Sequence, residues 1–372
     1  MYLQVFGTVE TVRGVAAATL SVDDDRPAEY MIQWYGTGIN PGAILSTAEE
    51  NGDTIELIPR WLYRVGSNGG LILPPLLTDE EVSGLKATHA TLRKTDQGLE
   101  GNWTGPNMPS GAISFPKAPD ILKGVKAVRC RSWAGFKSWA AERRSQDNAA
   151  WFRGHGCSSY SLRTSLHRAG RHRMDRYLAT ELVQFKSHVE AVFNRRFNLN
   201  DGDDYSTVLV LGQHHGLPTP MLDWTESPYI AAFFAFSDAL DAKRAGKKST
   251  HVRVFALSQK MIEGTSPRAV VVSWPQPFVA SLTVAPLHNP RLYAQQGRFM
   301  VTNVSNLEAF IRNIEIKAGM QHLFAIDIPV ACGTEALQDL AFMGLTAATM
   351  FPGLDGISRM IRHEMFYKKP LP

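Results

Sequence analysis

The feature that most constrains this chain is an abrupt change in charge and in hydrophobic pattern near residue 118. Before that point, short apolar or alternating runs typical of β-strands follow one another at a spacing of roughly ten residues. Residues 1–118 hold eight Lys/Arg against 14 Asp/Glu, a net charge of −6, whereas residues 119–372 hold 31 against 21, a net charge of +10. We therefore predict an α+β protein with an acidic all-β module over 1–118 and a mixed helix-and-strand domain over 119–372.

The strand spacing of the first part predicts a small β-barrel or a sandwich. Asn51-Gly52, between the runs AILSTAEE and DTIELIP, predicts a tight hairpin because both residues accept the positive φ values of a primed turn. SFPKAPD (114–120) predicts a linker. No cluster of reactive side chains stands out, so we expect a binding or scaffold module whose partner the sequence does not name.

The second part mixes helical and strand patterns. Ser132 is expected to cap a helix that buries Trp133, Phe136 and Trp139, and the run 174–197 predicts one long helix. Glu181 falls on the apolar face of that helix, where it needs either an arginine partner or a ligand. Residues 205–213 fit a strand or a helix. Four strands are expected at 251–257, 269–273, 299–304 and 322–328, and two helices at 334–344 and 356–366.

Composition excludes several protein classes. The chain is 44% hydrophobic and 20% charged, as in ordinary soluble globular proteins. Its longest apolar run, Tyr229 to Phe236, is far shorter than the ~18 residues of a membrane span. Three scattered cysteines favour reduced thiols in the cytoplasm over disulfides or a zinc site. The sequence has no Walker A loop and no GxGxxG, which argues against ATP and Rossmann-type dinucleotide binding.

Basic residues concentrate in the stretch 122–176, which holds 13 Lys/Arg and only three Asp/Glu. Such an excess fits a ligand that carries phosphate, or nucleic acid. A solvated basic face would produce the same pattern, and the sequence leaves both interpretations open.

Three segments gather side chains that can perform chemistry. WFRGHG (151–156) places Arg153 between a strand and glycines, where its guanidinium can reach an anion. RLYAQQGRF (291–299) offers two amides. The densest cluster spans residues 213–227 and contains Gln213, His214, His215, Thr219, Asp223, Trp224, Thr225, Glu226 and Ser227. Adjacent histidines are a poor metal pair, so we expect no metal, and without a GxSxG elbow a catalytic triad is disfavoured. A loop held by its own hydrogen bonds is the simplest alternative.

Taken together, these segments resemble the FRG-domain family over roughly residues 130–360. The resemblance is carried by WFRGHG (151–156), SLRTSLHR (161–168), Glu181, QHHGLPTPMLDWTESPYIAAFFAF (213–236), RLYAQQGRF (291–299) and MFPGLDGI (350–357). The arrangement is in turn similar to ADP-ribosyltransferases. In those enzymes a first strand carries a residue that grips NAD, a second carries a Ser/Thr pattern that leads into a helix, and a third often carries a catalytic glutamate.

The resemblance implies roles for individual residues. Arg153 matches the first strand, and Thr225 and Ser227 match the second. The third motif has Gln295, Gln296 and Gly297 and no glutamate, so Glu181, Asp223 and Asp355 are the available carboxylates. The candidate catalytic residues are Glu181, His214, Asp223 and Gln296. The candidate NAD-binding residues are Arg153, Gly154, His215, Trp224, Thr225, Ser227 and Tyr293, with Trp224 or Tyr293 stacking on nicotinamide.

The expected function is therefore NAD-dependent ADP-ribosyl transfer or NAD hydrolysis, with NAD as substrate, no metal, and DNA or RNA as the expected acceptor. Two alternatives stay open. One is a metal-independent nuclease that uses His214 or His215 as acid and base. The other is a non-catalytic module that binds nucleotide or nucleic acid.

Overall fold

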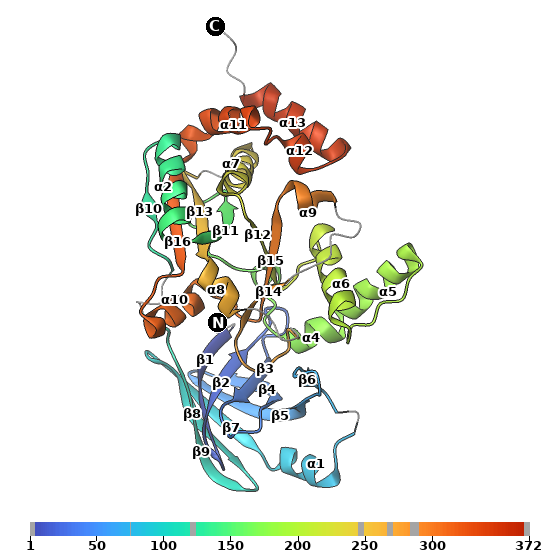
Figure 1. Ribbon diagram of the computed structural model, residues 1–372. Coiled ribbons are helices and arrows are strands. Elements are labelled where there is room, and N and C mark those ends of the chain that lie inside the picture. Colours follow the sequence, from blue (N-terminus) through green and yellow to red (C-terminus); the bar gives the residue numbers. More distant parts are fainter. Residues whose placement is uncertain are drawn as a thin grey trace.

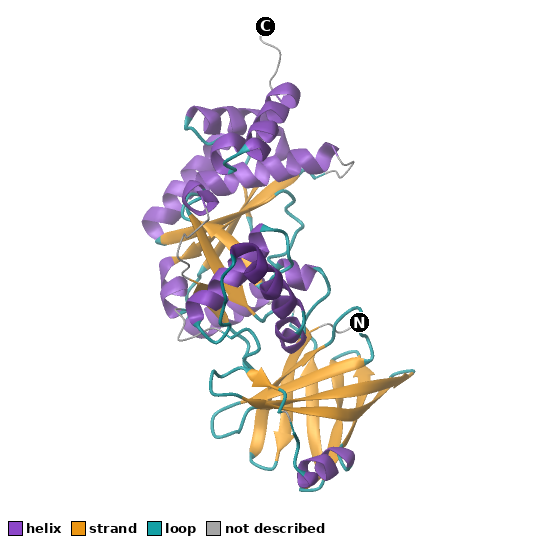
Figure 2. Ribbon diagram, turned by 90° about the vertical axis from the view of Figure 1, so that its right-hand side faces the viewer, coloured by secondary structure: helices purple, strands orange, loops and turns teal. Residues whose placement is uncertain are grey.

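The computed structural model describes residues 4–74, 76–119, 124–244, 249–265, 271–282 and 290–367. A β-barrel forms one end of the molecule, and a larger region of helices around a second sheet forms the other (Figure 1). The view at right angles separates the two parts clearly, and it shows strands forming the wall of the barrel with one short helix at its far end (Figure 2). Within the described residues, no helix has both the length and the apolar character needed to cross a membrane.

The N-terminal part is a closed antiparallel barrel of eight strands. The strands follow one another around the barrel in the order β1-β2-β3-β4-β5-β7-β8-β9. The pairing of β9 with β1 closes the barrel. The barrel strands are β1 (Gln4–Thr11), β2 (Gly14–Ser21), β3 (Glu29–Tyr35), β4 (Gly42–Asn51), β5 (Thr54–Val65), β7 (His89–Thr95), β8 (Gly98–Gly105) and β9 (Met108–Pro116); short β6 (Leu71–Ile72) extends β5, and α1 (Asp79–Lys86) precedes β7. Of the two predicted architectures, the barrel is confirmed.

Local sequence explains the barrel's regularity. A hairpin joins β4 to β5 as predicted, but its tip is Gly52-Asp53 rather than Asn51-Gly52. Asn51 pairs with Thr54 at the end of the strands, and only Gly52, with a φ of 60°, has the expected positive value. Alternate residues of each strand point inward. The end of the barrel near the α/β region is filled by Leu20, Tyr30, Ile55, Leu92, Leu99 and Phe115, each 4% exposed or less.

The C-terminal part is built on a seven-stranded mixed sheet in the order β10-β16-β13-β11-β12-β15-β14. These strands are β10 (Val128–Arg129), β11 (Ala149–His155), β12 (Met221–Thr225), β13 (His251–Ser258), β14 (Val279–Leu282), β15 (Gly297–Thr302) and β16 (Leu323–Pro329). The helices are α2 (Trp133–Gln146), α3 (Ser165–Arg168), α4 (Met174–Ala179), α5 (Glu181–Phe193), α6 (Gly202–His214), α7 (Pro228–Arg244), α8 (Gln259–Gly264), α9 (Pro290–Ala294), α10 (Leu307–Ala318), η2 (Val330–Cys332), α11 (Gly333–Phe342), α12 (Ala347–Met350) and α13 (Leu354–Tyr367).

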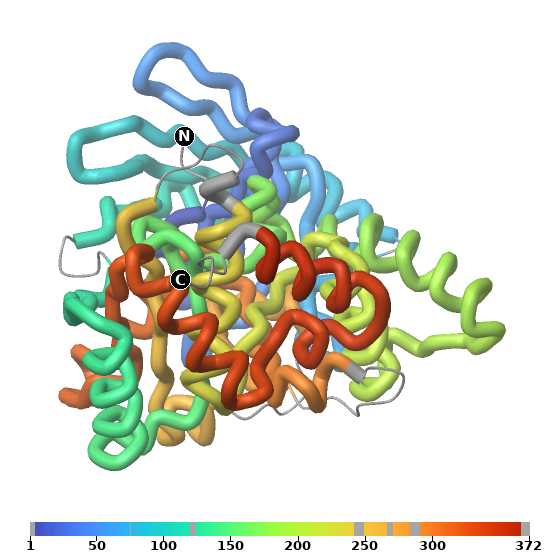
Figure 3. The backbone as a smooth tube through the Cα atoms, turned by 90° about the horizontal axis from the view of Figure 1, so that it is seen from above, coloured from blue at the N-terminus to red at the C-terminus, as the bar shows by residue number. Residues whose placement is uncertain are grey.

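Three hydrophobic clusters hold this part together. One joins α2, α7 and α11 to β11, β13 and β16. A second joins α4, α5 and α6 to β12, β14 and β15, and a third packs α8 and α10 against the sheet. Seen from above, the C-terminal helices cross the end of the molecule opposite the barrel (Figure 3).

Several predicted elements appear as expected, and others need correction. Ser132 caps α2, and 205–213 is helical, within α6. The predicted helix 174–197 is wrong as a single unit, because the chain breaks at Thr180 (φ −118°, ψ −74°) into α4 and α5. Val192, expected on the buried face, is 79% exposed. Residues 271–273 are not a strand, and the rest of the predicted strand 269–273 lies outside the described residues.

The two parts meet through an ion-pair network. Asp23 is 1% exposed, and its carboxylate accepts from the backbone N–H groups of His172 (2.6 Å) and Arg173 (3.0 Å) and from Arg176 Nη1 (3.1 Å). Asp25 pairs with Arg171 and Arg176, and this lowers the pKa of its carboxyl below the ordinary range. Arg173, buried itself, pairs with Glu29 of the barrel. Part of the negative charge of the barrel and part of the positive charge of the α/β region therefore neutralise each other.

Candidate functional site

The three polar segments of the sequence meet at one cavity of about 290 Å³. They meet because β11, β12 and β15 are neighbours in the sheet. β11 and β12 share a single residue pair, Phe152 with Thr225, so the two strands diverge beyond it. The cavity is lined by Phe152, Arg153, Gly154, Gln213, His214, Asp223, Trp224, Thr225, Ala231, Phe234, Arg291, Leu292, Gln295, Gly297, Arg298, Phe299 and Phe351.

Arg153 bridges the gap between the diverging strands. Its Nη1 donates to the backbone oxygen of Asp223, and its Nε donates to His155 Nε2 at 3.2 Å. Burial lowers the pKa of Arg153 from its usual value, and the carboxylate of Asp223 opposes this shift. Arginine nevertheless stays charged in proteins. Two anchoring bonds hold the guanidinium in one position, so it is pre-organised for an anion.

His155 is a positioning residue that the sequence reasoning missed. It is 8% exposed, and burial together with the charge of Arg153 lowers its pKa to about 3. The ring is therefore neutral near pH 7. Because Nε2 accepts from Arg153, the proton lies on Nδ1, which donates to the carbonyl of Tyr160 at 3.3 Å. Its position two residues after Arg153 on the same strand face was a signal available in the sequence.

Asp223 carries the only carboxylate among the residues that line the cavity. Gln213 Nε2 donates to Asp223 Oδ2 at 2.9 Å, and the other end of that amide accepts from Thr219 Oγ1. Thr219 is in turn held by Ser165, whose hydroxyl accepts from its backbone N–H at 2.9 Å. This chain of hydrogen bonds fixes the direction of the carboxylate, so the predicted loop held by its own hydrogen bonds exists and also orients a cavity residue.

Cations outnumber the carboxylate around the cavity. Arg291 and Arg298 join Arg153 in the lining, and Arg298 also pairs with Glu226 at 2.7 Å. The sequence reasoning singled out the glutamines of RLYAQQGRF and overlooked the arginines that flank them. His214, also in the lining, has its pKa lowered by burial, with Asp223 opposing. The cavity is therefore suited to an anionic ligand.

Two aromatic rings form another part of the cavity wall. Phe234 from α7 and Phe351 from the C-terminal segment meet edge to face, with centroids 5.8 Å apart and planes at 84°. Arg291 lies 5.8 Å from the centroid of the Phe351 ring. Gln295 Nε2 donates to the backbone oxygen of Met350 at 2.9 Å, which ties the third motif to this wall. The segment 350–357 therefore belongs to the site through Phe351.

The two residues predicted to stack on nicotinamide differ in their relation to the cavity. Trp224 is among the residues that line it, but it is 3% exposed and its ring packs in the cluster of Leu222 and Met300. Successive strand residues face opposite sides, so Trp224 and Asp223 point apart. Tyr293 is 73% exposed and does not line the cavity. Phe234 and Phe351 are the aromatic residues of the wall, and Arg359 lies 4.6 Å from the centroid of the Phe351 ring.

Glu181 and His215 also lie outside the lining. The break at Thr180 makes Glu181 the first residue of α5, where its side chain is 31% exposed and approaches Arg171 at 3.8 Å. The arginine partner considered for Glu181 is therefore present. His215 is the C-cap residue of α6.

The remaining predicted residues hold the backbone around the cavity in place, through side-chain hydroxyls or through backbone groups. Ser227 Oγ accepts from the N–H of Ile230 at the start of α7, and Thr225 Oγ1 accepts from the N–H of Ser227. Gln296 adopts a φ of 45°, and its carbonyl accepts from the N–H of Glu226. Gly154 lets α7 approach, because a Cβ there would overlap the carbonyl oxygen of Ala231. These residues shape the cavity without offering it a side chain, except Thr225, which lines it.

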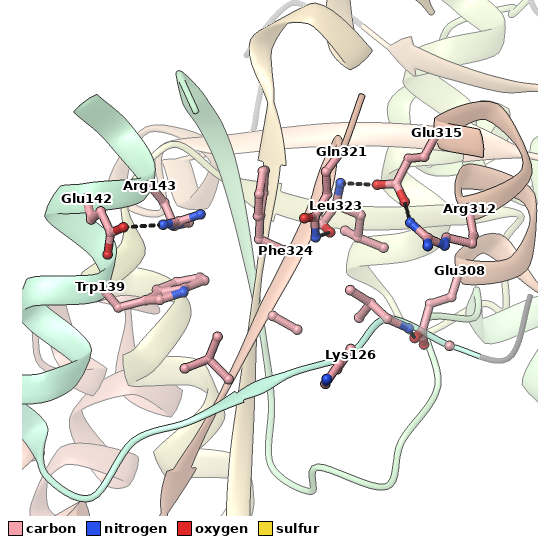
Figure 4. Close-up of a pocket in the computed structure, with 14 residues that line it drawn as sticks. Lys126, Trp139, Glu142, Arg143, Glu308, Arg312, Glu315, Gln321, Leu323 and Phe324 are labelled. Carbon is pink, nitrogen blue, oxygen red and sulfur yellow. Dashed lines mark hydrogen bonds and ion pairs between the residues drawn. The ribbon is translucent and has the colours of Figure 1, made fainter. Parts of the chain in front are cut away.

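A larger cavity of about 710 Å³ lies between α2, β10, β16 and α10 (Figure 4). Several of its polar side chains are engaged with one another and with the backbone, whereas Lys126 is exposed. Arg143 pairs with Glu142 at 2.6 Å, and Glu315 accepts from the N–H groups of His322 and Leu323 and pairs with Arg312. No residue of the three segments lines it, so size alone does not mark the site.

Metal ligands do not converge in the part of the chain that the structure describes. Across those residues, no group of three or more His, Cys, Asp or Glu side chains could hold an ion.

Comparison with known families bears on the strand and helix that flank the cavity. Residues 148–244 match the FRG domain. The match runs from the start of β11 to the end of α7, so the FRG domain supplies Arg153, Gln213, His214 and Asp223. The resemblance to the FRG-domain family is thereby confirmed for these residues. Arg291, Arg298 and Phe351 lie beyond the match. No curated protein and no solved structure is significantly similar to the chain.

Proposed function

We propose that the cavity of the FRG domain binds NAD and that the chain cleaves the bond between nicotinamide and ribose. The observation that carries this proposal is the lining itself. Three arginines, one oriented carboxylate and an aromatic pair surround about 290 Å³. Cationic side chains can bind the pyrophosphate of NAD, and an aromatic face can stack on its nicotinamide ring. A carboxylate can stabilise the positive charge that develops on the ribose. The volume is at the lower end of the ~300–1,000 Å³ of small-molecule sites, so it would enclose one half of the dinucleotide.

In the proposed reaction the C–N bond breaks, and its electron pair leaves with the nicotinamide nitrogen, which becomes neutral. The ribose passes through an oxocarbenium-like state. Asp223 would stabilise that positive charge, and Gln213 would keep the carboxylate aimed at it. Water or an acceptor hydroxyl then attacks the anomeric carbon and loses its proton. Arg153 would hold the pyrophosphate, and Phe351 or Phe234 the nicotinamide ring.

DNA or RNA remains the proposed acceptor, although fewer basic residues are free to bind it than the sequence suggested. Arg171, Arg173 and Arg176 pair with carboxylates of the barrel. Exposed positive charge in the basic stretch is left at Lys126, Arg129, Arg131, Arg144 and Arg168. Incubation of the full chain with labelled NAD and DNA, RNA or protein tests the choice by showing which one takes up label.

The decisive experiment measures nicotinamide release from NAD by the purified full chain. Asp223→Asn should lower the rate by about 10²–10³-fold, the cost of losing one pre-organised electrostatic group, while NAD still binds. Glu181→Gln is the matched control, because it removes a carboxylate outside the cavity, and its rate should equal that of the wild type. Equal losses in both variants, or normal release by Asp223→Asn, would refute the assignment.

A non-catalytic nucleotide-binding module is the second candidate. The observation in its favour is that the third motif lacks a glutamate and that Asp223 is already bonded to Gln213. NAD binding by the wild type without nicotinamide release would establish this candidate instead. The nuclease alternative has less support, because of its two histidines only His214 lines the cavity.

A further inference from the structure

The barrel encloses a cavity that the proposed function does not use. It measures about 300 Å³. It lies inside the eight strands and is lined by Val9, Thr11, Val12, Ile32, Trp34, Ile44, Ser46, Leu57, Pro59, Leu62, Thr88, Ala90, Trp103 and Ile113. We propose that this lumen binds a small, uncharged and largely apolar molecule that carries one hydrogen-bonding group.

The cavity occupies the half of the barrel away from the α/β region. Gln4, at the start of β1, bonds to Asn303 and Ser305 of that region, whereas Thr11, at the end of β1, lines the cavity. The inner side chains near the α/β region are large and fill the barrel. Toward the other end, small residues such as Ser46 and Ala90 leave the space open. The barrel is therefore packed at one end and hollow at the other.

The lining defines the chemistry of the ligand. None of its side chains is charged. The two indole N–H groups already have partners, since Trp34 donates to the carbonyl of Asn40 at 2.9 Å and Trp103 donates to that of Glu10 at 2.7 Å. Both indoles therefore offer the cavity apolar surface. A charged ligand would lose its hydration here without compensation, so an uncharged apolar one is favoured.

Ser46 supplies a single polar contact. The residue is 4% exposed and lines the cavity, where its hydroxyl can donate or accept a hydrogen bond. The other two hydroxyls of the lining are engaged, because Thr11 donates to the carbonyl of Gly14 and Thr88 to that of Gly84. Buried hydroxyls are nearly always bonded, so a ligand atom at Ser46 would complete the site.

The cavity is also accessible. Val12, in the turn between β1 and β2, lines it and is 63% exposed, whereas Leu57 and Ile113 are 2% and 3% exposed. Val12 therefore marks the rim and the other two mark the wall. A ligand can enter from the end of the barrel without disturbing the contacts with the FRG domain.

The test uses N-phenyl-1-naphthylamine, an uncharged dye that fluoresces in apolar surroundings, with the full chain. The wild type should enhance its emission saturably with one site per chain. Ala90→Phe, which fills the lumen, should weaken binding at least tenfold. Val15→Phe adds the same ring on an outward-facing position that is 67% exposed, and should bind as the wild type does. Ile44→Trp is a second lumen-filling variant if thermal melts show that Ala90→Phe is unfolded.

Dye could also adhere to the exposed apolar residues of α13, Leu354, Ile357 and Ile361. Binding there would survive in Ala90→Phe, so undiminished binding by that variant overturns the proposal, as does a wild type with no saturable enhancement. The role of Ser46 is tested by displacement. 1-Naphthol should displace the dye more strongly than naphthalene, and Ser46→Ala should abolish that difference. If 1-naphthol and naphthalene displace the dye equally well from the wild type, the proposed hydrogen bond to Ser46 is refuted. Nicotinamide release, measured in parallel, is independent of either result.

Discussion

Removing the carboxylate of Asp23 should destabilise the whole chain, because this buried side chain bonds to three groups of the α/β region. In Asp23→Ala, the backbone N–H groups of His172 and Arg173 lose their acceptor while buried, at about 1–3 kcal/mol each. Arg176 loses one of its two carboxylate partners. Breaking a buried pair costs about 3–5 kcal/mol, and we expect a loss of that size in the free energy of unfolding.

A series of substitutions separates hydrogen bonding from charge. Asp23→Asn keeps one oxygen for the two N–H groups, so its loss should be smaller, about 1–2 kcal/mol. Asp24→Ala is the matched control, since Asp24 is the next residue and is exposed. Its effect should stay within about 0.5 kcal/mol. Urea denaturation followed by circular dichroism gives the three values. If Asp23→Ala costs no more than Asp24→Ala, the carboxylate does not hold the interface and the reasoning fails.

Three further predictions concern charge and protonation. Arg173→Glu should lower the melting temperature sharply, because Arg173 is 5% exposed and paired, whereas Arg144→Glu, at an exposed position, should not; equal melts would contradict the network. Arg153→Lys should weaken NAD binding by about 1.5–3 kcal/mol, roughly 10–100-fold by titration calorimetry, since lysine cannot make two parallel bonds; unchanged affinity would assign Arg153 a structural role. His155 and His172 are buried with pKa values of about 3 and 4, below the ~6.5 of the unfolded chain, so stability should be full above pH 6.5 and fall toward pH 4. Each unit of pKa shift corresponds to about 1.4 kcal/mol in the free energy of unfolding, which gives about 3 kcal/mol for His172. If urea denaturation gives the same free energy of unfolding at every pH, the two rings are solvated.

Part of the site was readable from the sequence because it depends on short segments. The strand that carries Arg153, the cap at Ser227 and the helix that follows are local patterns, and the structure shows each of them. The opposite directions of Asp223 and Trp224 could also have been read, since strand residues alternate. The arginines of the third motif were visible as well.

Other features could not be read, because they depend on pairing between distant residues. Glu181 sits on an apolar face by periodicity, but the break at Thr180 turns it toward Arg171. The basic stretch suggested a nucleic-acid surface. Three of its arginines instead meet barrel carboxylates about 150 residues earlier in the chain. Net charge along a sequence does not say which charges are neutralised inside the molecule.

The sequence by itself determined the two-part organisation, the β character of the first part and the identity of the segments that could carry chemistry. Each of these follows from period, composition or turn residues within a few neighbouring positions. Closure of the barrel, in contrast, becomes visible only in three dimensions, because it depends on β1 meeting β9 across the whole first part. The same holds for the finding that Asp223, rather than Glu181, shares a cavity with Arg153. That outcome rests on strand order and on where β11 and β12 separate, and non-local contacts of this kind have no signature in the local pattern.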